Sequence, residues 1–469
     1  MFMTSFRLAC EIKTVKHIRL PNELLTRKQR KAAGKALRDK CPRRAHGTWR
    51  APGNRRDPVE LLIQSNKDRI PDLVPIRYGR MMHSPFAFYR GAAAIMAADL
   101  AVTPTSEIRV QACGDCHLMN FGGFGTPERR IIFDINDFDE TLPAPWEWDL
   151  KRLAVSFIIA GRNNRFKEAE SHKAALRCIQ SYHEHMHWYA EISALEMWYQ
   201  RMDNMVACIT SRKWKKIVEK QIAKAATRTV AEHDFPKLVS VKNGQVRIKD
   251  NPPLVFHQRG VGTEDYTRLI EDALRCYRES LPDDLKALLD RYQVKDVAVK
   301  VVGVGSVGTR CAIVLIMTVD DEPLFLQIKE AHESALAPYA GKSVYSNNGQ
   351  RVVAGQRLMQ AASDIFLGWT VQLGRHFYVR QLRDIKIEPL VEFFDLGALA
   401  DYGEWCGWAL ARAHAKSGDA ATISGYLGNA SRFDDAVLNF AVAYADQNER
   451  DYQALLEAIR AGKIEVLQE

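Results

Sequence analysis

Gly303-Val304-Gly305-Ser306-Val307-Gly308 is a glycine-rich stretch whose surroundings decide the fold class. A G-x-G-x-x-G pattern alone is weak evidence, because unrelated nucleotide-binding folds share it. A dinucleotide site needs a helix directly after the glycines. Residues 311–319 are instead a run of apolar and β-branched residues, which predicts a strand. The glycines are therefore predicted to lie at the tip of a hairpin, where they could cover phosphate groups.

The sequence around the glycines predicts a mostly antiparallel sheet with one helix near 352–362. The predicted strands are apolar runs bounded by glycines or by an acidic turn, at 297–304, 311–319, 324–328, 365–371 and 377–382. Leu326-Gln327-Ile328-Lys329 has the pattern of a buried strand that ends in lysine, as in the V-A-I-K strand of kinases. The Lys329 ammonium group could pair with nucleotide phosphates; the alternative is a lysine that extends from a strand end to solvent.

Gly114-Asp115-Cys116-His117-Leu118-Met119-Asn120 follows a predicted strand at 108–113. An aspartate five residues before an asparagine allows a carboxylate to face an attacking hydroxyl while the amide oxygen reaches a metal ion, as phosphoryl transfer requires. Asp115 and His117 are the candidate catalytic residues, and Asn120 is a candidate metal ligand. The alternative for this stretch is an ordinary Asx-turn or cap.

Phe133-Asp134-Ile135-Asn136-Asp137-Phe138-Asp139-Glu140 places four acids within seven residues beside an apolar strand. Such a cluster repels itself unless a cation is present, and Mg²⁺ prefers oxygen ligands and also bridges phosphates. We therefore predict Asp134, Asp137 and Asp139 as metal ligands. An exposed acidic turn is the alternative.

These stretches resemble the family catalogued as domain of unknown function 2252, and the resemblance covers nearly the whole chain after Arg56. It also rests on four further stretches, at 75–81, 84–91, 145–152 and 355–364. The candidate site is more distantly similar to that of aminoglycoside phosphotransferases and related small-molecule kinases, whose active loop carries H-G-D-x-H-x-x-N before an apolar strand and D-F or D-W. This similarity implies Asp115 as base, Asn120 and Asp137 as metal ligands, and Lys329 as phosphate partner.

The order of the motifs departs from that of kinases, because the catalytic-type loop precedes the glycines and the lysine. The resemblance therefore implies an α+β, kinase-like, two-lobed fold that is circularly permuted. A histidine expected before Gly114 is replaced by Cys113, and the acid that should pair with Lys329 is ambiguous between Glu330 and Glu333. A rival loop, His414-Ala415-Lys416-Ser417-Gly418-Asp419, would restore kinase order, but it lacks a suitably spaced asparagine, so we favour Asp115.

The predicted organisation has four parts: a basic, partly disordered leader at 1–56, a helix-rich lobe with the catalytic-type and metal-type loops at 57–293, an antiparallel-sheet nucleotide lobe at 294–390, and C-terminal helices on the large lobe at 391–469. The leader carries 16 Lys and Arg against 3 acids, and this accounts for the net charge of +9. Nucleic acid is nevertheless not expected as a partner. No stretch of about twenty apolar residues occurs, so no membrane span is expected. Nine scattered cysteines favour reduced thiols and a cytoplasmic protein.

The sequence thus predicts a phosphotransferase that depends on ATP and magnesium and acts on an unidentified small-molecule or protein acceptor. Gly303, Gly305, Gly308 and Lys329 are the candidate nucleotide-binding residues. Two alternatives use the same site: a nucleotidyl transferase, or a nucleotide-binding regulator without turnover. Arginines at 77, 80 and 90 could form a fork for a phosphate or an acidic substrate, although surface salt bridges explain them equally well.

Overall fold

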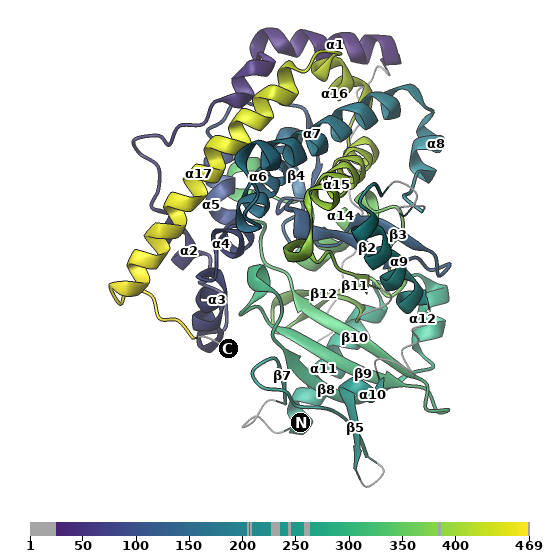
Figure 1. The fold of residues 1–469 in the computed structure, drawn as a ribbon. Helices are drawn as coiled ribbons and strands as arrows, with labels where there is room; N and C mark the ends of the chain where they lie inside the picture. Colours follow the sequence, from purple (N-terminus) through teal and green to yellow (C-terminus); the bar gives the residue numbers. More distant parts are fainter. Residues whose placement is uncertain are drawn as a thin grey trace, which may run out of the picture.

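The structure is a computed structural model that describes residues 25–203, 206, 209–226, 235–242, 245–257, 263–382 and 386–467. It is 53% helical and 16% strand, and its sheets are antiparallel, which confirms a mixed α+β fold. Figure 1 shows a helical part above and a sheet below. The purple beginning and the yellow end of the described chain both lie in the helical part. The first 24 residues of the predicted basic leader lie outside the described residues.

The helical part is built from two stretches of chain that flank the sheet in sequence. Its main helices are α2 (Pro58–Gln64), α3 (Val74–Met81), α4 (Pro85–Gly91), α5 (Ala93–Leu100), α6 (Trp146–Asn163), α7 (Glu168–Glu191), α8 (Ala194–Tyr199), α9 (Arg212–Ala226), α15 (Leu396–Ser417), α16 (Ala420–Leu427) and α17 (Arg432–Arg460). α7 and α15 approach so closely that a side chain at Gly407 would lie 2.2 Å from the Cys178 carbonyl oxygen. The predicted packing of the C-terminal helices against the earlier helices is therefore present (Figure 1).

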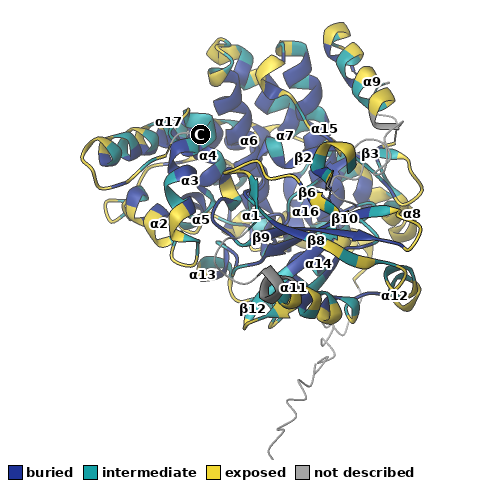
Figure 2. Ribbon diagram, turned by 90° about the horizontal axis from the view of Figure 1, so that it is seen from below, coloured by how far each residue is buried: buried dark blue, intermediate teal, exposed yellow. Residues whose placement is uncertain are grey.

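α6 is the central helix of this part. Almost every residue from Trp146 to Gly161 is buried, including charged residues that in most helices would face solvent. Figure 2 shows the same distinction, with α6 largely dark blue and α7 and the outer helices partly exposed. Charged side chains on α6 must therefore find partners inside the protein, and two of them reach the candidate site.

The six-stranded sheet is antiparallel, in the order β11-β12-β10-β9-β8-β7. Its strands are β7 (Val255–Phe256), β8 (Gln293–Lys300), β9 (Cys311–Met317), β10 (Pro323–Glu330), β11 (Gly368–Gln372) and β12 (Arg375–Gln381). α14 (Asn348–Met359) follows β10, after the short α13 (Ala337–Ala340). The predicted meander and its following helix and strands are thus confirmed, with shifts of a few residues at their ends.

The sheet part begins earlier in the chain than the predicted boundary at residue 294. It also includes α10 (Phe235–Leu238), the hairpin of β5 (Val239–Lys242) and β6 (Gln245–Ile248), α11 (Thr263–Arg278) and α12 (Asp283–Leu289). β7 pairs with β8, and α11 packs against β11. The hydroxyl of the buried Tyr277 on α11 donates to the carbonyl of Phe366, which lies in the segment just before β11. Packing and pairing therefore assign the described residues between 235 and 292 to the sheet part.

Part of the basic leader is folded. α1 (Arg27–Lys40) begins with a capping box between Thr26 and Gln29, and it lies along α16. A side chain at Gly34 would meet the Thr422 carbonyl oxygen at 2.0 Å, so glycine permits this close contact. No helix within the described ranges is long and apolar enough to cross a membrane.

Two small sheets carry the loops of the candidate site. β1 (Arg109–Ala112) pairs with β4 (Leu142–Pro145), and β2 (Phe121–Gly125) lies between β3 (Ile131–Ile135) and β13 (Lys386–Ile387). The catalytic-type stretch is the connection from β1 to β2, and the acidic stretch leads from β3 to β4. Since β1 pairs with β4 and β2 with β3, both stretches emerge at the same place, facing β10.

Candidate functional site

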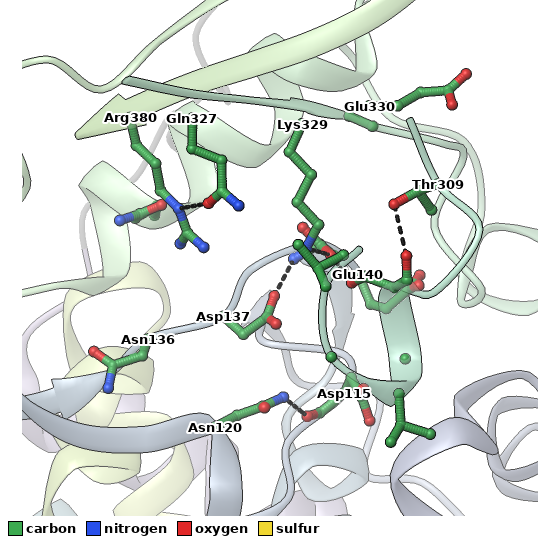
Figure 3. Close-up of a pocket in the computed structure, with 18 of the residues that line it drawn as sticks. Asp115, Asn120, Asn136, Asp137, Glu140, Thr309, Gln327, Lys329, Glu330 and Arg380 are labelled. Carbon is green, nitrogen blue, oxygen red and sulfur yellow. Dashed lines mark hydrogen bonds and ion pairs between the residues drawn. The ribbon is translucent and has the colours of Figure 1, made fainter. Parts of the chain in front are cut away.

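A cavity of about 1270 Å³ lies between the six-stranded sheet and these two stretches. Eight of the ten predicted site residues line it: Asp115, His117, Asn120, Asp137, Asp139, Gly303, Gly305 and Lys329. In Figure 3, Lys329 and Arg380 reach from the sheet toward Asp137, while Asp115 and Asn120 lie on the opposite side. Residues almost two hundred positions apart therefore share one cavity.

The backbone before Asp115 is held in a fixed turn. Gly114 has a φ of +86°, and a side chain there would meet the Glu140 carbonyl oxygen at 2.3 Å. Only glycine combines this conformation with this contact. Asp149 on α6 accepts hydrogen bonds from the backbone N–H groups of Cys113 and Gly114, at 2.6 and 2.9 Å. The buried helix thus fixes the position of the catalytic-type loop.

Within the described ranges, Asp115 accepts side-chain hydrogen bonds at one carboxylate oxygen, Oδ1. Arg152, also on α6, donates from Nε to Oδ1 at 2.8 Å and from its terminal nitrogen to the same oxygen. Burial raises the pKa of Asp115, and the positive charge of Arg152 opposes that rise. The Asn120 side-chain amide donates to the Asp115 backbone carbonyl at 2.6 Å, which turns the amide oxygen away from the loop. Asp115 Oδ2 remains available to accept a proton.

His117 is 4% exposed, and its Nε2 lies 3.8 Å from Asp115 Oδ2. Burial, together with the positive charges of Arg152 and Arg90, lowers the pKa of His117 well below its ordinary value, so the ring is neutral. Its buried Nδ1 has no hydrogen-bond partner within the part of the chain described. His117 can orient or polarise a neighbouring group, but it does not supply a positive charge.

Lys329 forms an ion pair with Asp139, and neither Glu330 nor Glu333 takes this role. The Asp139 carboxylate also accepts hydrogen bonds from the Tyr378 hydroxyl at 2.8 Å and the Ser306 hydroxyl at 3.0 Å. Burial alone would raise the pKa of Asp139, but Lys329 and Tyr378 outweigh it and lower the pKa to about 2. Both oxygens of Asp139 therefore already accept protein donors.

Asp137 is placed differently from Asp139. Its Oδ1 accepts the Asp139 backbone N–H at 3.1 Å, and burial together with the charge of Asp139 raises its pKa. A carboxylate held in this way gains from a cation. Asp137 and Asn120 each present oxygen to the cavity, which fits Mg²⁺, an ion that commonly takes one or two protein ligands and completes its shell with phosphate and water. The described residues contain no cluster of three or more His, Cys, Asp or Glu able to hold a metal by itself.

Asp134 does not join these groups, although it was predicted as a metal ligand. It lies on β3, is fully buried, and pairs with Arg412 of α15 at 2.6 Å. It also accepts the Ala361 backbone N–H at 2.8 Å. Its carboxylate fixes the helical part to the end of α14 and does not line the cavity.

The glycine stretch connects β8 and β9 through a short helical turn at Val304–Ser306. Arg69 donates to the Gly305 carbonyl at 2.8 Å and to the Val307 carbonyl, and the Ile70 N–H donates to the Gly308 carbonyl at 2.8 Å. Gly303 and Gly305 line the cavity, whereas Gly308 bends the backbone beside Arg69 with a φ of +88°. The helical part thus holds the glycine stretch over Asp115.

The rival loop lies elsewhere. Asp419 caps the N-terminus of α16 and pairs with Arg30 of α1 at 2.6 Å. His414 hydrogen-bonds with Asp149 and Tyr182 inside the helical part. Neither His414 nor Asp419 lines the cavity.

Several residues that shape the site carried no clear signal in the sequence. Arg152, Tyr378 and Arg69 act through contacts between distant segments, so no spacing could identify them. Arg351 on α14 donates to the backbone carbonyls of Asp139, Thr141 and His332. α14 therefore contributes an arginine that holds the acidic stretch, where a kinase helix would contribute a glutamate for the lysine.

No curated protein and no solved structure matches the chain. A family model described as "uncharacterized protein conserved in bacteria" matches residues 69–458. This range includes the glycine stretch, the catalytic-type stretch, the acidic stretch and most of the helical part. The match spans most of the chain, and the protein therefore belongs to this family, domain of unknown function 2252.

Proposed function

We propose that the protein is a phosphotransferase of the kinase-like type, which uses ATP and Mg²⁺ and acts on a hydroxyl acceptor. The observation that carries this proposal is the shared cavity, in which Lys329 and the glycine hairpin face Asp115, Asn120 and Asp137. A lysine and a glycine hairpin bind phosphates in kinases, and an aspartate, an asparagine and a second aspartate serve the acceptor and the metal.

The order of elements in the sheet supports the same function. Two strands joined by the glycine stretch are followed by the lysine strand β10, then by α14, and then by two further strands. Protein kinases likewise carry a glycine loop, a lysine on the third strand, and a helix after it. The lysine here pairs with Asp139, while in kinases it pairs with a glutamate from that helix. The ion pair that positions the lysine is thus retained with a different partner.

The proposed reaction assigns one task to each group. Asp115 Oδ2 accepts the proton of the acceptor hydroxyl as the acceptor oxygen forms a bond to the γ-phosphorus of ATP. The bond from the γ-phosphorus to the β,γ-bridging oxygen breaks, and ADP leaves. Lys329 stabilises negative charge on the phosphates, and Mg²⁺, held by Asn120 and Asp137, would supply further charge stabilisation there. Arg152 keeps Asp115 oriented without occupying Oδ2.

The free Oδ2 of Asp115 favours turnover over a purely regulatory role, since a nucleotide sensor needs no base. Transfer of the nucleotidyl group would use the same residues but would leave the α-phosphate on the acceptor. ATP labelled at the α- or the γ-position therefore distinguishes the two reactions, because only the γ-label reaches the product of phosphoryl transfer.

The first experiment is a thermal-shift measurement with ATP and Mg²⁺ together and separately. Ligands selective for the folded state raise the melting temperature. We expect a shift with millimolar MgATP that is reduced in Lys329→Ala and Asp137→Ala and retained in Asp419→Asn, whose side chain lies outside the cavity. Absence of any shift in the unsubstituted protein, with no label transferred from either ATP, would overturn the proposal.

A further inference from the structure

The cavity continues past Asp115, away from Lys329, toward β2 and β13. The residues that line this outer end include Arg90, Met119, Phe124, Arg129, Lys386 and Glu388. If Asp115 is the base, the acceptor must approach from this side, because the sheet side holds Lys329 and the glycine hairpin. The chemistry of the outer end therefore bears on the acceptor.

Most arginine side chains around the cavity are already used by the protein. The partners are main-chain carbonyls or side chains for Arg69, Arg77, Arg80, Arg152, Arg351 and Arg380. Arg77, for example, donates to the Gly91 carbonyl at 2.9 Å and to the Asn66 side chain. These side chains hold the walls of the cavity together. Arg380 donates from its Nε to Gln327, and its terminal nitrogens face Asp137 at the Lys329 end of the cavity (Figure 3).

Arg90 differs from these arginines, because no nitrogen of its side chain has a hydrogen-bond partner among the described residues. It is the penultimate residue of α4, and its Nε is buried without a partner, as are those of Arg77 and Arg351, which donate instead from their terminal nitrogens. Arg90 nevertheless lines the cavity. A buried guanidinium donor without a partner costs free energy, because the group loses its hydrogen bonds to water without replacing them.

Arg90 also lies where an acceptor would lie. A side chain at Gly305 would meet the Arg90 backbone oxygen at 3.5 Å and Asp115 Oδ2 at 3.9 Å, so the glycine hairpin, Asp115 and Arg90 converge. The carboxylates that act on Lys329 are Asp139 and Asp137. Those that act on Arg90 are Asp115, Glu388 of the outer end, and Glu392, which lies outside the cavity lining. The two cations therefore serve opposite ends of the cavity.

The neighbouring carboxylates leave Arg90 available to a ligand. Asp115 directs its Oδ1 to Arg152, and Glu388 pairs with Lys386 at 3.0 Å. A planar guanidinium binds carboxylate and phosphate groups through two parallel hydrogen bonds, so an anion is the ligand that matches a partnerless arginine.

We propose that Arg90 binds an anionic group of the acceptor, so that the substrate is a hydroxyl compound that also carries a carboxylate or a phosphate. This inference rests on the proposed function and specifies its acceptor class. Arg90 would hold the anionic end of the acceptor and thereby direct its hydroxyl to Asp115 Oδ2.

The test uses the full-length protein saturated with Mg²⁺ and a non-hydrolysable ATP analogue, so that the nucleotide phosphate positions are filled. Isothermal titration calorimetry then measures binding of inorganic phosphate, glycerol 3-phosphate, glycerate and neutral glycerol. Binding of inorganic phosphate and glycerol 3-phosphate would identify the anionic group of the acceptor as a phosphate, and binding of glycerate would identify it as a carboxylate. We expect at least one of these two kinds of anion to bind, and we expect neutral glycerol not to bind. Arg90→Gln should weaken anion binding at least tenfold and leave the affinity for the ATP analogue within about twofold, since the carboxylates that act on Arg90 differ from those that act on Lys329.

Two controls separate this role from a structural one. Arg56→Gln removes a cavity arginine that hydrogen-bonds with Gln64, and it should leave anion binding unchanged. The melting temperature of ligand-free Arg90→Gln should stay close to that of the unsubstituted protein, because the Arg90 side chain makes no hydrogen bond with the described residues and loses only its attraction to nearby carboxylates. Arg90→Lys should retain part of the anion affinity.

Three results would overturn the proposal. One is equal anion affinity in the unsubstituted protein and Arg90→Gln, and another is a loss of analogue binding in Arg90→Gln, which would assign Arg90 to the nucleotide. The third is failure of every anion to bind while the analogue binds. Failure of the analogue to bind to the unsubstituted protein is a separate result, and it would refute the proposed function itself.

Discussion

The ion pair between Lys329 and Asp139 gives the most direct test of how the sheet is joined to the acidic stretch. Lys329→Met keeps most of the side-chain volume but removes the charge, leaving the Asp139 carboxylate buried without its cation. The Lys329 side chain is 4% exposed and that of Asp139 is 25% exposed, so the pair is shielded from water. Removing one partner of a buried pair typically costs about 3–5 kcal/mol.

We expect the lower end of that range, about 3 kcal/mol, because the Tyr378 and Ser306 hydroxyls still donate to Asp139. Urea denaturation of the ligand-free protein measures the loss. Lys386→Met is the matched control: Lys386 also lines the cavity, but its ion pair with Glu388 has side chains that are 49% and 66% exposed. An exposed pair contributes about 0–1 kcal/mol, so the control should lose little stability.

The dependence on pH adds a second criterion. In the unsubstituted protein the pKa of Asp139 is about 2, below its ordinary value of 3.8, so the pair stabilises the fold fully above pH 3.8 and loses this contribution as pH falls toward 2. Without Lys329, burial raises the pKa of Asp139 above 3.8, and its charge destabilises the fold at neutral pH. Protonation relieves that cost as pH falls through the raised pKa.

The stability difference between Lys329→Met and the unsubstituted protein should therefore narrow between pH 7 and pH 4. Adding Asp139→Asn to Lys329→Met removes the unpaired charge, so the double variant should regain stability at pH 7 and lose this pH dependence. The reasoning is refuted if Lys329→Met loses no more stability than Lys386→Met, or if its loss is the same at pH 7 and pH 4.

Three further predictions concern the catalytic-type loop. Asp115→Asn should keep nucleotide affinity in calorimetry and lower transfer roughly a hundredfold or more. Asp419→Asn should keep the helix cap, since asparagine caps as well as aspartate, and lose only the partly exposed ion pair with Arg30, about 1 kcal/mol or less in urea denaturation. The opposite pattern would move the base to Asp419. Arg152→Gln removes the cation that opposes the raised pKa of Asp115, so the pKa of Asp115 should rise further. The acid limb of the pH profile of kcat/KM, where protonation of the base stops the reaction, should therefore move to higher pH. An acid limb at the same pH in both proteins would exclude Asp115 as the base. Gly114→Ala should lower the free energy of unfolding by about 2 kcal/mol or more, because position 114 has a positive φ and a side chain there would lie 2.3 Å from the Glu140 carbonyl oxygen. A smaller loss of stability than in Asp419→Asn would contradict this constraint.

The sheet was largely predictable because its strands are continuous apolar runs separated by turn residues. Every residue of β9 from Cys311 to Met317 is buried, which is the environment that such a run indicates. The glycine stretch was assigned to a hairpin by the same argument, since a strand follows it. The beginning of the sheet part was harder to define, because β7 has only two residues and joins the sheet through pairing with β8.

The acidic stretch shows where sequence reasoning stops. Asp134, Asp137 and Asp139 look equivalent in a list of acids, yet one pairs with Arg412, one faces the cavity, and one pairs with Lys329. The partner of each is set by segments that lie far away in the chain, and both faces of β3 are buried, so alternation gives no guidance. A composition argument alone could not separate these roles.

The basic leader was judged by its charge, although it also contained a local folding signal. Thr26 and Gln29 form a capping box, and this three-residue spacing is visible in the sequence. Charged residues such as Arg30 and Arg38 find partners on α16, at Asp419 and the Tyr426 carbonyl. Net charge describes the solubility of a segment, and it does not determine whether its residues have folded partners.

The path of the chain gives the candidate site a property that motif order alone does not convey. The chain leaves the helical part after α9, forms the sheet part, and returns through β13, which pairs with β2 directly beside the catalytic-type loop. The sheet part is therefore connected to the helical part at both ends, and Arg69 and Arg80 add hydrogen bonds to the segment that carries the glycines. Contacts of Arg69, Arg80 and the Lys329–Asp139 pair therefore join the two parts on either side of the cavity. A bound nucleotide would compete with Asp139 for Lys329, so part of its binding free energy is spent in weakening the Lys329–Asp139 ion pair. Lys329→Met removes this ion pair, whereas Asp137→Ala leaves it in place. The two variants should therefore lose nucleotide affinity for different reasons.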